Sequence, residues 1–243
     1  MMDALDVEPG ALEESLRFIR GVNRWLGGVR AVTGALDRYR VRWGGEVGTE
    51  ERPLRVLDVG TGSADVPVAI ARWGAKRGVA VRVTALDLHP TTLAAARRYV
   101  IGELGAGAIE DGAVELVEGD ALELTDRFAD RSFDYVHAGM FIHHLSDMRV
   151  LTALTQMDRV ALRGIVWNDL LRSGWSRFGI RVLTAGAGAM VKHDARVSVD
   201  AGFTRREVLG IRDRLSLGYT ELRVSRMMGR FVLAGDRSVL GAE

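Results

Sequence analysis

The stretch that most constrains this chain is RVLDVGTGSADVPVAIARW, residues 55–73. A hydrophobic run ends at Asp58, two glycines follow one residue apart, and an apolar pattern with helical spacing then begins. A buried strand that stops at small residues before a helix brings the free N–H groups of the helix N-terminus to the sheet edge. Gly60 and Gly62 can adopt positive φ angles and let a ligand approach the backbone closely. The stretch therefore predicts a strand, a ligand-binding loop and a helix.

The segments around and after this loop repeat the same order of strand and helix. Strands are predicted at 54–59, 79–87, 113–117, 133–139 and 162–168, and helices at 64–77, 91–104 and 146–159. This alternation is typical of a doubly wound α/β fold, a parallel sheet with helices on both faces. Further along we expect a long apolar helix at 173–191, a loop through KHDARVSVDAGF and a helix at 204–214. The runs GYTELRVS and GRFVLAG then predict a closing antiparallel pair of strands.

The N-terminal part has a different pattern. Residues 11–40 carry one apolar stripe at spacings of three and four, interrupted by Gly27 and Gly28. This predicts two helices with a hinge, followed by a linker at 43–53. We therefore expect a helical lid segment at 1–52 and a ligand-binding domain at 53–243, which together form a single domain.

Composition limits the class of protein. The 243 residues include 33 basic and 32 acidic side chains, so a net charge of +1 gives no global attraction to nucleic acids or membranes. Cysteine is absent, which excludes disulfides, thiolate metal sites and cysteine nucleophiles. The acidic start MMDALDVEPGALEES does not resemble a signal peptide, and no apolar run reaches the roughly 18 residues of a membrane span. We expect a cytoplasmic protein.

Two more acidic residues stand at predicted strand ends. The run VTALDLHP ends its strand at Asp87, where doubly wound folds place an acid that binds the ribose hydroxyls. The alternative role for Asp87 is to cap the helix that follows at Pro90. In VEGDALEL, Asp120 is positioned to accept a hydrogen bond from an adenine amino group.

The third glycine of a dinucleotide-binding fingerprint is missing. Its place falls at Ala64 or Asp65, and Asp58 stands just before the loop. A carboxylate there suits an ammonium group and disfavours a pyrophosphate. Carboxylates at three successive strand ends fit a ligand with an amine, a ribose and an adenine. S-adenosylmethionine has these three parts.

These motifs resemble a known family. The runs VLDVGTGSADVPVAIA, VTALDLHPTTLAAAR, VEGDALEL and FDYVHAGMFIHHLSD look like the successive motifs of class I S-adenosylmethionine-dependent methyltransferases, over about residues 54–168. The resemblance implies a Rossmann-like sheet of seven strands with the last strand antiparallel. It also implies S-adenosyl-L-methionine as the cofactor. The chain departs from the family at Ala64, where a third glycine is frequent.

The resemblance also implies roles for individual residues. Asp58, Gly60 and Gly62 would hold the methionine end, with Thr61 between the glycines. Asp87 would bind the ribose, with Leu88 beside it, and Asp120 with Ala121 would bind the adenine. Gly139 and Met140 would lie near the sulfonium. The candidate cofactor-binding residues are thus Asp58, Gly60, Thr61, Gly62, Asp87, Leu88, Asp120, Ala121, Gly139 and Met140.

The methyl acceptor is harder to predict. If it is a hydroxyl, a histidine is the natural general base. FIHHLSD puts His143 and His144 just past the fourth strand, and KHDARVSV puts His193 beside Asp194 in a loop expected to cover the acceptor. We take His144 and His193 as the catalytic candidates, and packing or solvated roles remain open for both. No metal site is expected, since adjacent histidines rarely chelate one ion.

We predict an enzyme that methylates a small molecule, most simply an O-methyltransferase acting on a phenolic, hydroxyquinone or polyketide-like acceptor of secondary metabolism. The apolar run at 173–191 is expected to form a pocket wall for an aromatic or acyl-bearing compound. C-methylation of an activated ring is the near alternative. An NAD-dependent oxidoreductase and a non-catalytic partner subunit are more distant ones. We expect no nucleic-acid partner, and a homodimer remains open.

Overall fold

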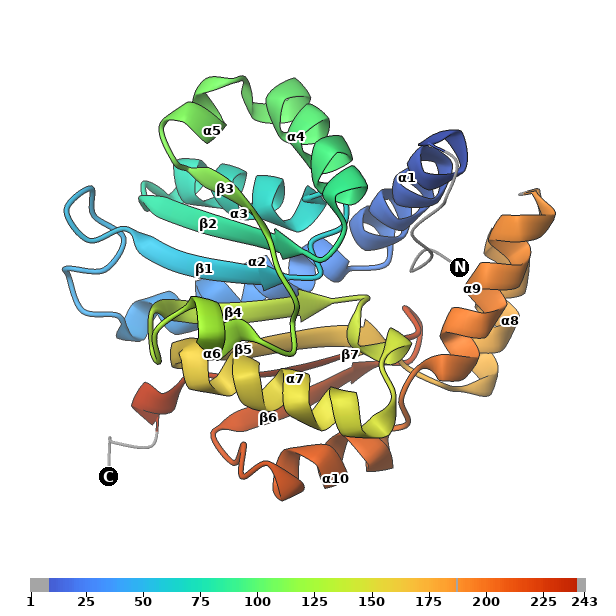
Figure 1. The fold of residues 1–243 in the computed structure, drawn as a ribbon. Coiled ribbons are helices and arrows are strands. Elements are labelled where there is room, and N and C mark those ends of the chain that lie inside the picture. Colours follow the sequence, from blue (N-terminus) through green and yellow to red (C-terminus); the bar gives the residue numbers. More distant parts are fainter. Residues whose placement is uncertain (1–8, 187, 240–243) are drawn as a thin grey trace.

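The computed structural model describes residues 9–186 and 188–239, and its centre is a seven-stranded sheet (Figure 1). The strand order is β3-β2-β1-β4-β5-β7-β6. β1 to β5 are parallel, and β7 lies antiparallel between β5 and β6. The predicted seven-stranded Rossmann-like sheet with an antiparallel last strand is confirmed. The strands are β1 (Leu54–Val59), β2 (Val81–Asp87), β3 (Val114–Glu118), β4 (Phe133–Gly139), β5 (Ala161–Leu170), β6 (Thr220–Ser225) and β7 (Arg230–Gly235).

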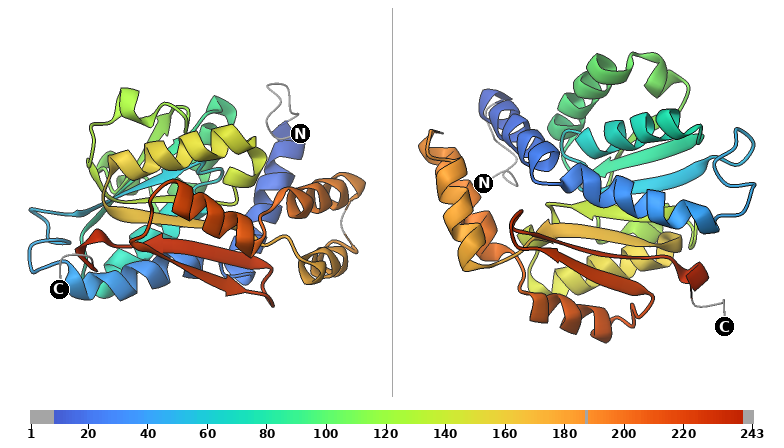
Figure 2. Two further views of the ribbon diagram at one scale, coloured as in Figure 1. Left: turned by 90° about the horizontal axis from the view of Figure 1, so that it is seen from below. Right: turned by 180° about the vertical axis from the view of Figure 1, so that it is seen from behind.

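Helices cover both faces of the sheet, as Figure 2 shows from two further sides. α2, α3 and α4 pack on one face, and α6, α7 and α10 pack on the other. Two further helices, α8 and α9, form a hairpin beyond the carboxyl ends of the strands. The helices are α1 (Pro9–Trp25), α2 (Gly28–Tyr39), α3 (Asp65–Arg77), α4 (Pro90–Leu104), α5 (Gly107–Glu110), α6 (Leu124–Arg127), α7 (Asp147–Val160), α8 (Gly174–Leu183), α9 (Ala189–Ala201) and α10 (Arg205–Arg214), with short 3₁₀ turns η1 (Arg40–Arg42), η2 (Ile142–His144) and η3 (Arg237–Val239).

The central strands are buried on both faces, which explains their nearly continuous apolar sequence. In β1, Val56 packs against the side covered by α2 and α3, and Leu57 packs against the side covered by α7. Side chains of consecutive residues point to opposite faces, so both layers of core meet in this strand. Since β1, β2 and β3 run parallel, the acids at or just after their carboxyl ends (Asp58, Asp87 and Asp120) lie at the same edge of the sheet.

The N-terminal segment forms two helices that meet at Gly27, whose φ of 83° only glycine adopts without strain. α2 is part of the core: Val32, Leu36 and Tyr39 are buried against the sheet. Trp43, which we expected in a linker, is also buried there, and its Nε1 donates to the hydroxyl of Tyr135 at 2.8 Å. Of the segment predicted as a lid, α2 and Trp43 therefore belong to the core, and only α1 remains as a candidate lid.

The prediction for residues 173–203 is wrong in its secondary structure. The expected long helix stops at Leu183, and the expected loop through KHDARVSVDAGF is mostly α9. Ala195 and Val199, four residues apart, are buried and give α9 its apolar face. The charged residues in and around this stretch, Lys192, Asp194, Arg196 and Asp200, concealed this pattern in the sequence. No helix in the described ranges is long and apolar enough to cross a membrane.

Candidate functional site

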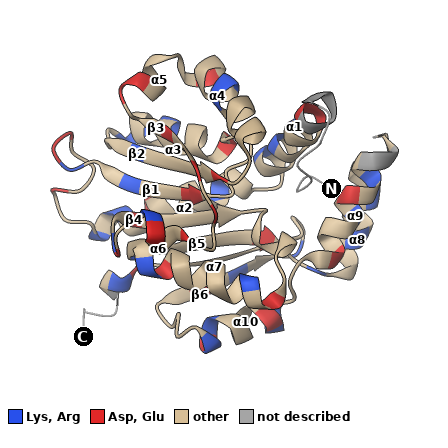
Figure 3. Ribbon diagram, viewed as in Figure 1, with Lys and Arg blue, Asp and Glu red and all other residues tan. Residues whose placement is uncertain are grey.

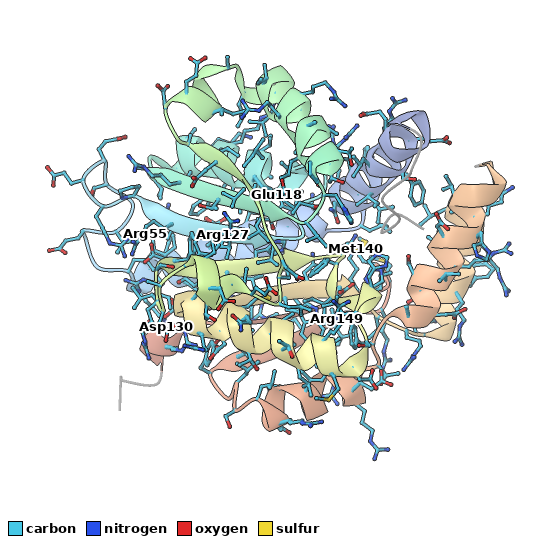
Figure 4. The ribbon with its side chains drawn as sticks, in the orientation of Figure 1. Arg55, Glu118, Arg127, Asp130, Met140 and Arg149 are labelled. Carbon is cyan, nitrogen blue, oxygen red and sulfur yellow. The ribbon has the colours of Figure 1, made fainter. Side chains whose placement is uncertain are left out.

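The ten predicted cofactor-binding residues line one hollow of about 350 Å³ at the carboxyl edge of the sheet. They come from the ends of β1, β2 and β4 and from the loop after β3. Figure 4 labels one of them, Met140, at this edge. The register of the parallel strands is what brings these separated motifs together. We call this hollow the cofactor crevice.

The glycine loop has the backbone that the sequence requires. Gly60 has a φ of 66°, and a Cβ added to it would lie 2.5 Å from Cγ of Phe141, so a side chain has no room there. Gly62 has a φ of 55°, and its N–H donates to Asp87 Oδ2 at 2.9 Å. Ala64 is left-handed as well, with a φ of 58°, where a third glycine would be free of strain.

The carboxylates of Asp87 and Asp120 are held by backbone groups. Asp87 accepts from the N–H of Gly62 and, at 3.1 Å, from that of His89. Burial raises the pKa of Asp87, and these two hydrogen bonds act against that rise. Asp120 accepts from the N–H of Leu122 at 2.9 Å. Both carboxylates are thus fixed in place along the crevice and retain lone pairs for a ligand.

Asp58 is more strongly engaged than the sequence indicates. Its Oδ2 accepts from the hydroxyl of Thr61 at 2.6 Å, and its Oδ1 lies 2.5 Å from Nδ1 of His137. All of these side chains line the cofactor crevice and are buried. Nε2 of His137 is buried with no hydrogen-bond partner in the described part of the chain. His137 is therefore a crevice residue as well as a core residue.

A buried polar network that sequence reasoning missed borders the same crevice. Asn23 of α1 donates through Nδ2 to Asp65 at 3.1 Å and accepts from Arg230 at 3.0 Å. Arg230 also donates to Asn168 at 3.3 Å. Burial raises the pKa of Asp65 to about 6, and burial lowers that of Arg230 to about 10. Asn23 and Asp65 line the crevice, so this network ties α1 to it.

A second hollow, of about 190 Å³, adjoins the first. We call it the acceptor pocket. Its lining is mostly apolar and comes from α1, α8, α9 and the turn between β6 and β7. Ile19, Met140 and His144 line both hollows, so the two spaces meet there. The apolar wall expected from residues 173–191 is present, since Trp175, Ile180 and other residues of that stretch line this pocket.

His143 in the acceptor pocket is paired with a buried acid. Its Nδ1 lies 2.6 Å from Oδ1 of Asp169, and its N–H donates to Oδ2 of the same carboxylate at 3.2 Å. Burial opposes ionisation of Asp169, but the interaction with His143 outweighs burial and keeps the pKa of Asp169 below its usual range. Nε2 of His143 is buried without a hydrogen-bond partner among the described residues.

The two predicted catalytic histidines differ in position. His144 is exposed at the junction of the two hollows, and its ring lies 4.1 Å from that of His143. His193 is exposed on α9 and is not among the described residues that line either hollow. Asp194, beside it, does line the acceptor pocket. The described residues contain no group of three side chains able to hold a metal ion.

The sheet order and the acids at the strand ends agree with the class I S-adenosylmethionine-dependent methyltransferases that the sequence motifs resemble. A family model described as a methyltransferase domain matches residues 56–164. A demethylmenaquinone methyltransferase of Roseiflexus sp. (strain RS-1) is 32% identical over 112 residues, which are 45% of this chain and 39% of that protein. The chain thus matches about two fifths of the length of this curated relative.

Solved structures share the fold. A protein of Methanococcus maripaludis named as a putative S-adenosyl-L-methionine-dependent methyltransferase superposes with a TM-score of 0.60 and 15% identity, covering 90% of each chain. A magnesium protoporphyrin IX methyltransferase of Synechocystis PCC 6803, solved with bound S-adenosylhomocysteine, has a TM-score of 0.57 and 13% identity. It covers 87% of this chain and 82% of its own. At identities this low, these superpositions show a common fold and nothing more.

The crevice fits S-adenosylmethionine, the cofactor of this class. The space that a Cβ of Gly60 would take is filled by the ring of Phe141, and both residues line the crevice. The carboxylates of Asp58, Asp87 and Asp120 follow one another along the ends of the adjacent strands β1, β2 and β3. This order matches the three parts of the cofactor.

Proposed function

We propose that this protein transfers a methyl group from S-adenosylmethionine to a hydroxyl of a small apolar acceptor, with His143 as the proton-accepting residue. The observation that carries the proposal is the pair of His143 and Asp169 beside an apolar pocket that adjoins the cofactor crevice. The ten crevice residues, which include the three strand-end acids and the glycine loop, are proposed to bind the cofactor as the sequence predicts.

The cofactor supplies a methyl group that its sulfonium makes electrophilic. What the chain has to provide is alignment of the acceptor and exclusion of water. Met140 and His144 stand where the two hollows meet, so a hydroxyl held in the acceptor pocket can point toward the crevice. Met140 has a left-handed backbone with a φ of 57°, a strained conformation of the kind that gathers at functional sites.

The proton is best taken by Nε2 of His143. Asp169 is a carboxylate and accepts hydrogen bonds, which assigns the imidazole proton to Nδ1 and leaves Nε2 as an acceptor. Asp169 also stabilises the imidazolium that forms when Nε2 gains the proton. His144 remains a second candidate because of its place at the junction. The exposed position of His193 does not support a role as base.

The acceptor is proposed to be a flat apolar compound with an ionisable hydroxyl, such as a phenol or hydroxyquinone. The size and apolar lining of the acceptor pocket support this class. One curated relative is named for demethylmenaquinone, which agrees with a quinone-type acceptor. C-methylation stays the alternative, since His143 could equally deprotonate a ring hydroxyl and so activate a neighbouring ring carbon.

The test is transfer of a labelled methyl group across a panel of phenols, hydroxyquinones and pyrones. His143→Ala should lower single-turnover rates by about 10²–10⁴-fold, with unchanged affinity for S-adenosylhomocysteine. His193→Ala is the matched control, because this exposed histidine should be replaceable without loss. In the wild-type protein the rate should rise with pH, between about 6 and 9, as the histidine loses its proton. The His143 variant should lack this rise.

Three results would contradict the proposal. A wild-type pH profile and rate in His143→Ala would exclude it as base, and a loss confined to His144→Ala would transfer the role. Binding of NAD with no binding of S-adenosylhomocysteine would point to an oxidoreductase. Tight binding of S-adenosylhomocysteine without turnover of any acceptor would favour a non-catalytic subunit. The position of the label in the product separates O-methylation from C-methylation.

A further inference from the structure

Large apolar side chains are exposed in one region of the surface. Eleven such side chains are exposed in the described part of the chain, and six of them surround the α8–α9 hairpin. Isolated exposed apolar residues are ordinary, but a cluster marks an interaction surface. We call these six residues the rim: Trp175, Phe178, Val182, Leu183, Val197 and Met227.

The rim surrounds the mouth of the acceptor pocket. Trp175, Leu183, Val197 and Met227 are more than half exposed and also line this pocket. The rings of Trp175 and Phe178 lie 6.1 Å apart in an edge-to-face contact. The hairpin projects beyond the strand ends in Figure 1, with α1 nearby, so the rim stands out from the body of the protein. The apolar surface is therefore continuous from the outside into the pocket.

Exposed arginines lie among these apolar residues. Arg181 on α8, Arg196 on α9 and Arg226 next to Met227 have no ion-pair partner among the described residues. Arg177 is paired with Asp200 at 2.7 Å. Figure 3 shows basic residues on both helices of the hairpin. Residues 174–201 carry four basic side chains, Arg177, Arg181, Lys192 and Arg196, against Asp194 and Asp200, so the hairpin has a local excess of positive charge in a chain whose net charge is +1.

We propose that the rim docks on the surface of a lipid bilayer that contains anionic lipids. Aromatic and aliphatic side chains flanked by arginine are the composition that partitions into the headgroup region, with the cations near lipid phosphates. The apolar part of the rim would lie in the interface and its arginines at the headgroups.

A second copy of the chain fits this surface less well than a bilayer does. A two-fold interface is formed by the same patch on both copies, so the unpaired arginines of the two rims would face one another. Such a contact would also cover the mouth of the acceptor pocket. A bilayer instead supplies anionic groups to the arginines and leaves an apolar path into the pocket.

Docking gives an apolar acceptor a direct route to the site. A compound that partitions into the bilayer would enter the pocket between Trp175 and Met227 without crossing water. This delivery step rests on the proposed function, whereas docking itself does not. Binding to vesicles in the absence of any acceptor or cofactor therefore tests the rim independently.

The experiment is flotation with vesicles of phosphatidylcholine, alone or mixed with phosphatidylglycerol. The full chain should float with the mixed vesicles, and F178S/V182S should bind them about tenfold more weakly. Phe178 and Val182 do not line the acceptor pocket, so affinity for S-adenosylhomocysteine and turnover of a water-soluble acceptor should stay normal. V41S/M148S is the matched control, because Val41 and Met148 are exposed apolar residues outside the rim.

Charge is tested separately with R181E/R196E. This variant should lose affinity for the mixed vesicles by about fivefold or more for each arginine, with the loss reduced at high salt. Failure of the wild-type chain to float, or equal binding by F178S/V182S, overturns the proposal. Sedimentation that shows a dimer abolished by F178S/V182S, with no vesicle binding, would assign the rim to a second copy instead.

Discussion

The contact between Gly60 and Phe141 can be tested by adding a single carbon. Gly60→Ala places a Cβ 2.5 Å from Cγ of the Phe141 ring, whereas carbon atoms pack best at about 3.5–4.0 Å, so the ring has to move by about 1 Å. Gly78→Ala is the matched control. Gly78 ends α3 with a φ of 63°, close to the 66° of Gly60, and a Cβ there would meet nothing within 4 Å.

The two substitutions share one cost and differ in another. A left-handed alanine costs about 1–2 kcal/mol at either position. Overpacking against the ring adds about 1–3 kcal/mol at Gly60 alone. Gly60→Ala should therefore lower the free energy of unfolding by about 2–5 kcal/mol, and Gly78→Ala by about 1–2 kcal/mol. Because Phe141 lines the cofactor crevice, only Gly60→Ala should also weaken the binding of S-adenosylhomocysteine.

Urea denaturation of the ligand-free protein and titration calorimetry with S-adenosylhomocysteine measure both effects. Repeating Gly60→Ala in a Phe141→Ala background should reduce the excess cost, since the ring atoms at 2.5 and 2.7 Å are then absent and only Cβ of residue 141, at 2.9 Å, remains close. Equal destabilisation by Gly60→Ala and Gly78→Ala would refute the steric argument. So would an unchanged cost of Gly60→Ala in the Phe141→Ala background.

Three further outcomes follow from the crevice. Asp87→Ala should weaken S-adenosylhomocysteine by about 1–3 kcal/mol in calorimetry, and an unchanged affinity would reduce this acid to a structural role in the loop. The pKa of Asp65 is about 6 in the folded protein against an ordinary 3.8, so the folded state holds its proton more tightly. Stability should therefore fall by up to about 3 kcal/mol as the pH rises from about 4 to about 6, and urea midpoints of Asp65→Asn should lack this decline. Amides of α1 should gain protection from hydrogen exchange when S-adenosylhomocysteine binds, while those of the buried α2 stay equally protected; a matching response in both helices would contradict a lid limited to α1.

Much of the fold was predictable because its signals are local. Both bounds of β1 and of β4 agree with the prediction to the residue, and each of these apolar runs ends at a glycine. Parallel pairing then brings strand ends to one edge, and this rule is enough to collect the ten crevice residues in one hollow. Their individual roles in binding remain predictions.

The parts that escaped prediction depend on distant pairs. Asp169 lies 26 residues after His143, and only the meeting of β5 with η2 shows that they pair. Asn23 and Arg230 are 207 residues apart, and neither stands in a recognisable motif. Sequence spacing gives the neighbours of a residue along one helix or strand, but side-chain pairs between elements require the packed structure.

The place of β7 in the sheet has a consequence for synthesis. β7 follows β6 along the chain but lies between β5 and β6, so β6 has no place in the sheet until β7 has emerged from the ribosome. Arg230, the first residue of β7, also holds Asn23 of the first helix. A nascent chain that has already made the glycine loop, β2 and β4 therefore still lacks the bond that secures α1 beside the crevice. Ligand capture should begin only after β7 has left the exit tunnel, which delays cofactor loading until well after the glycine loop has been made.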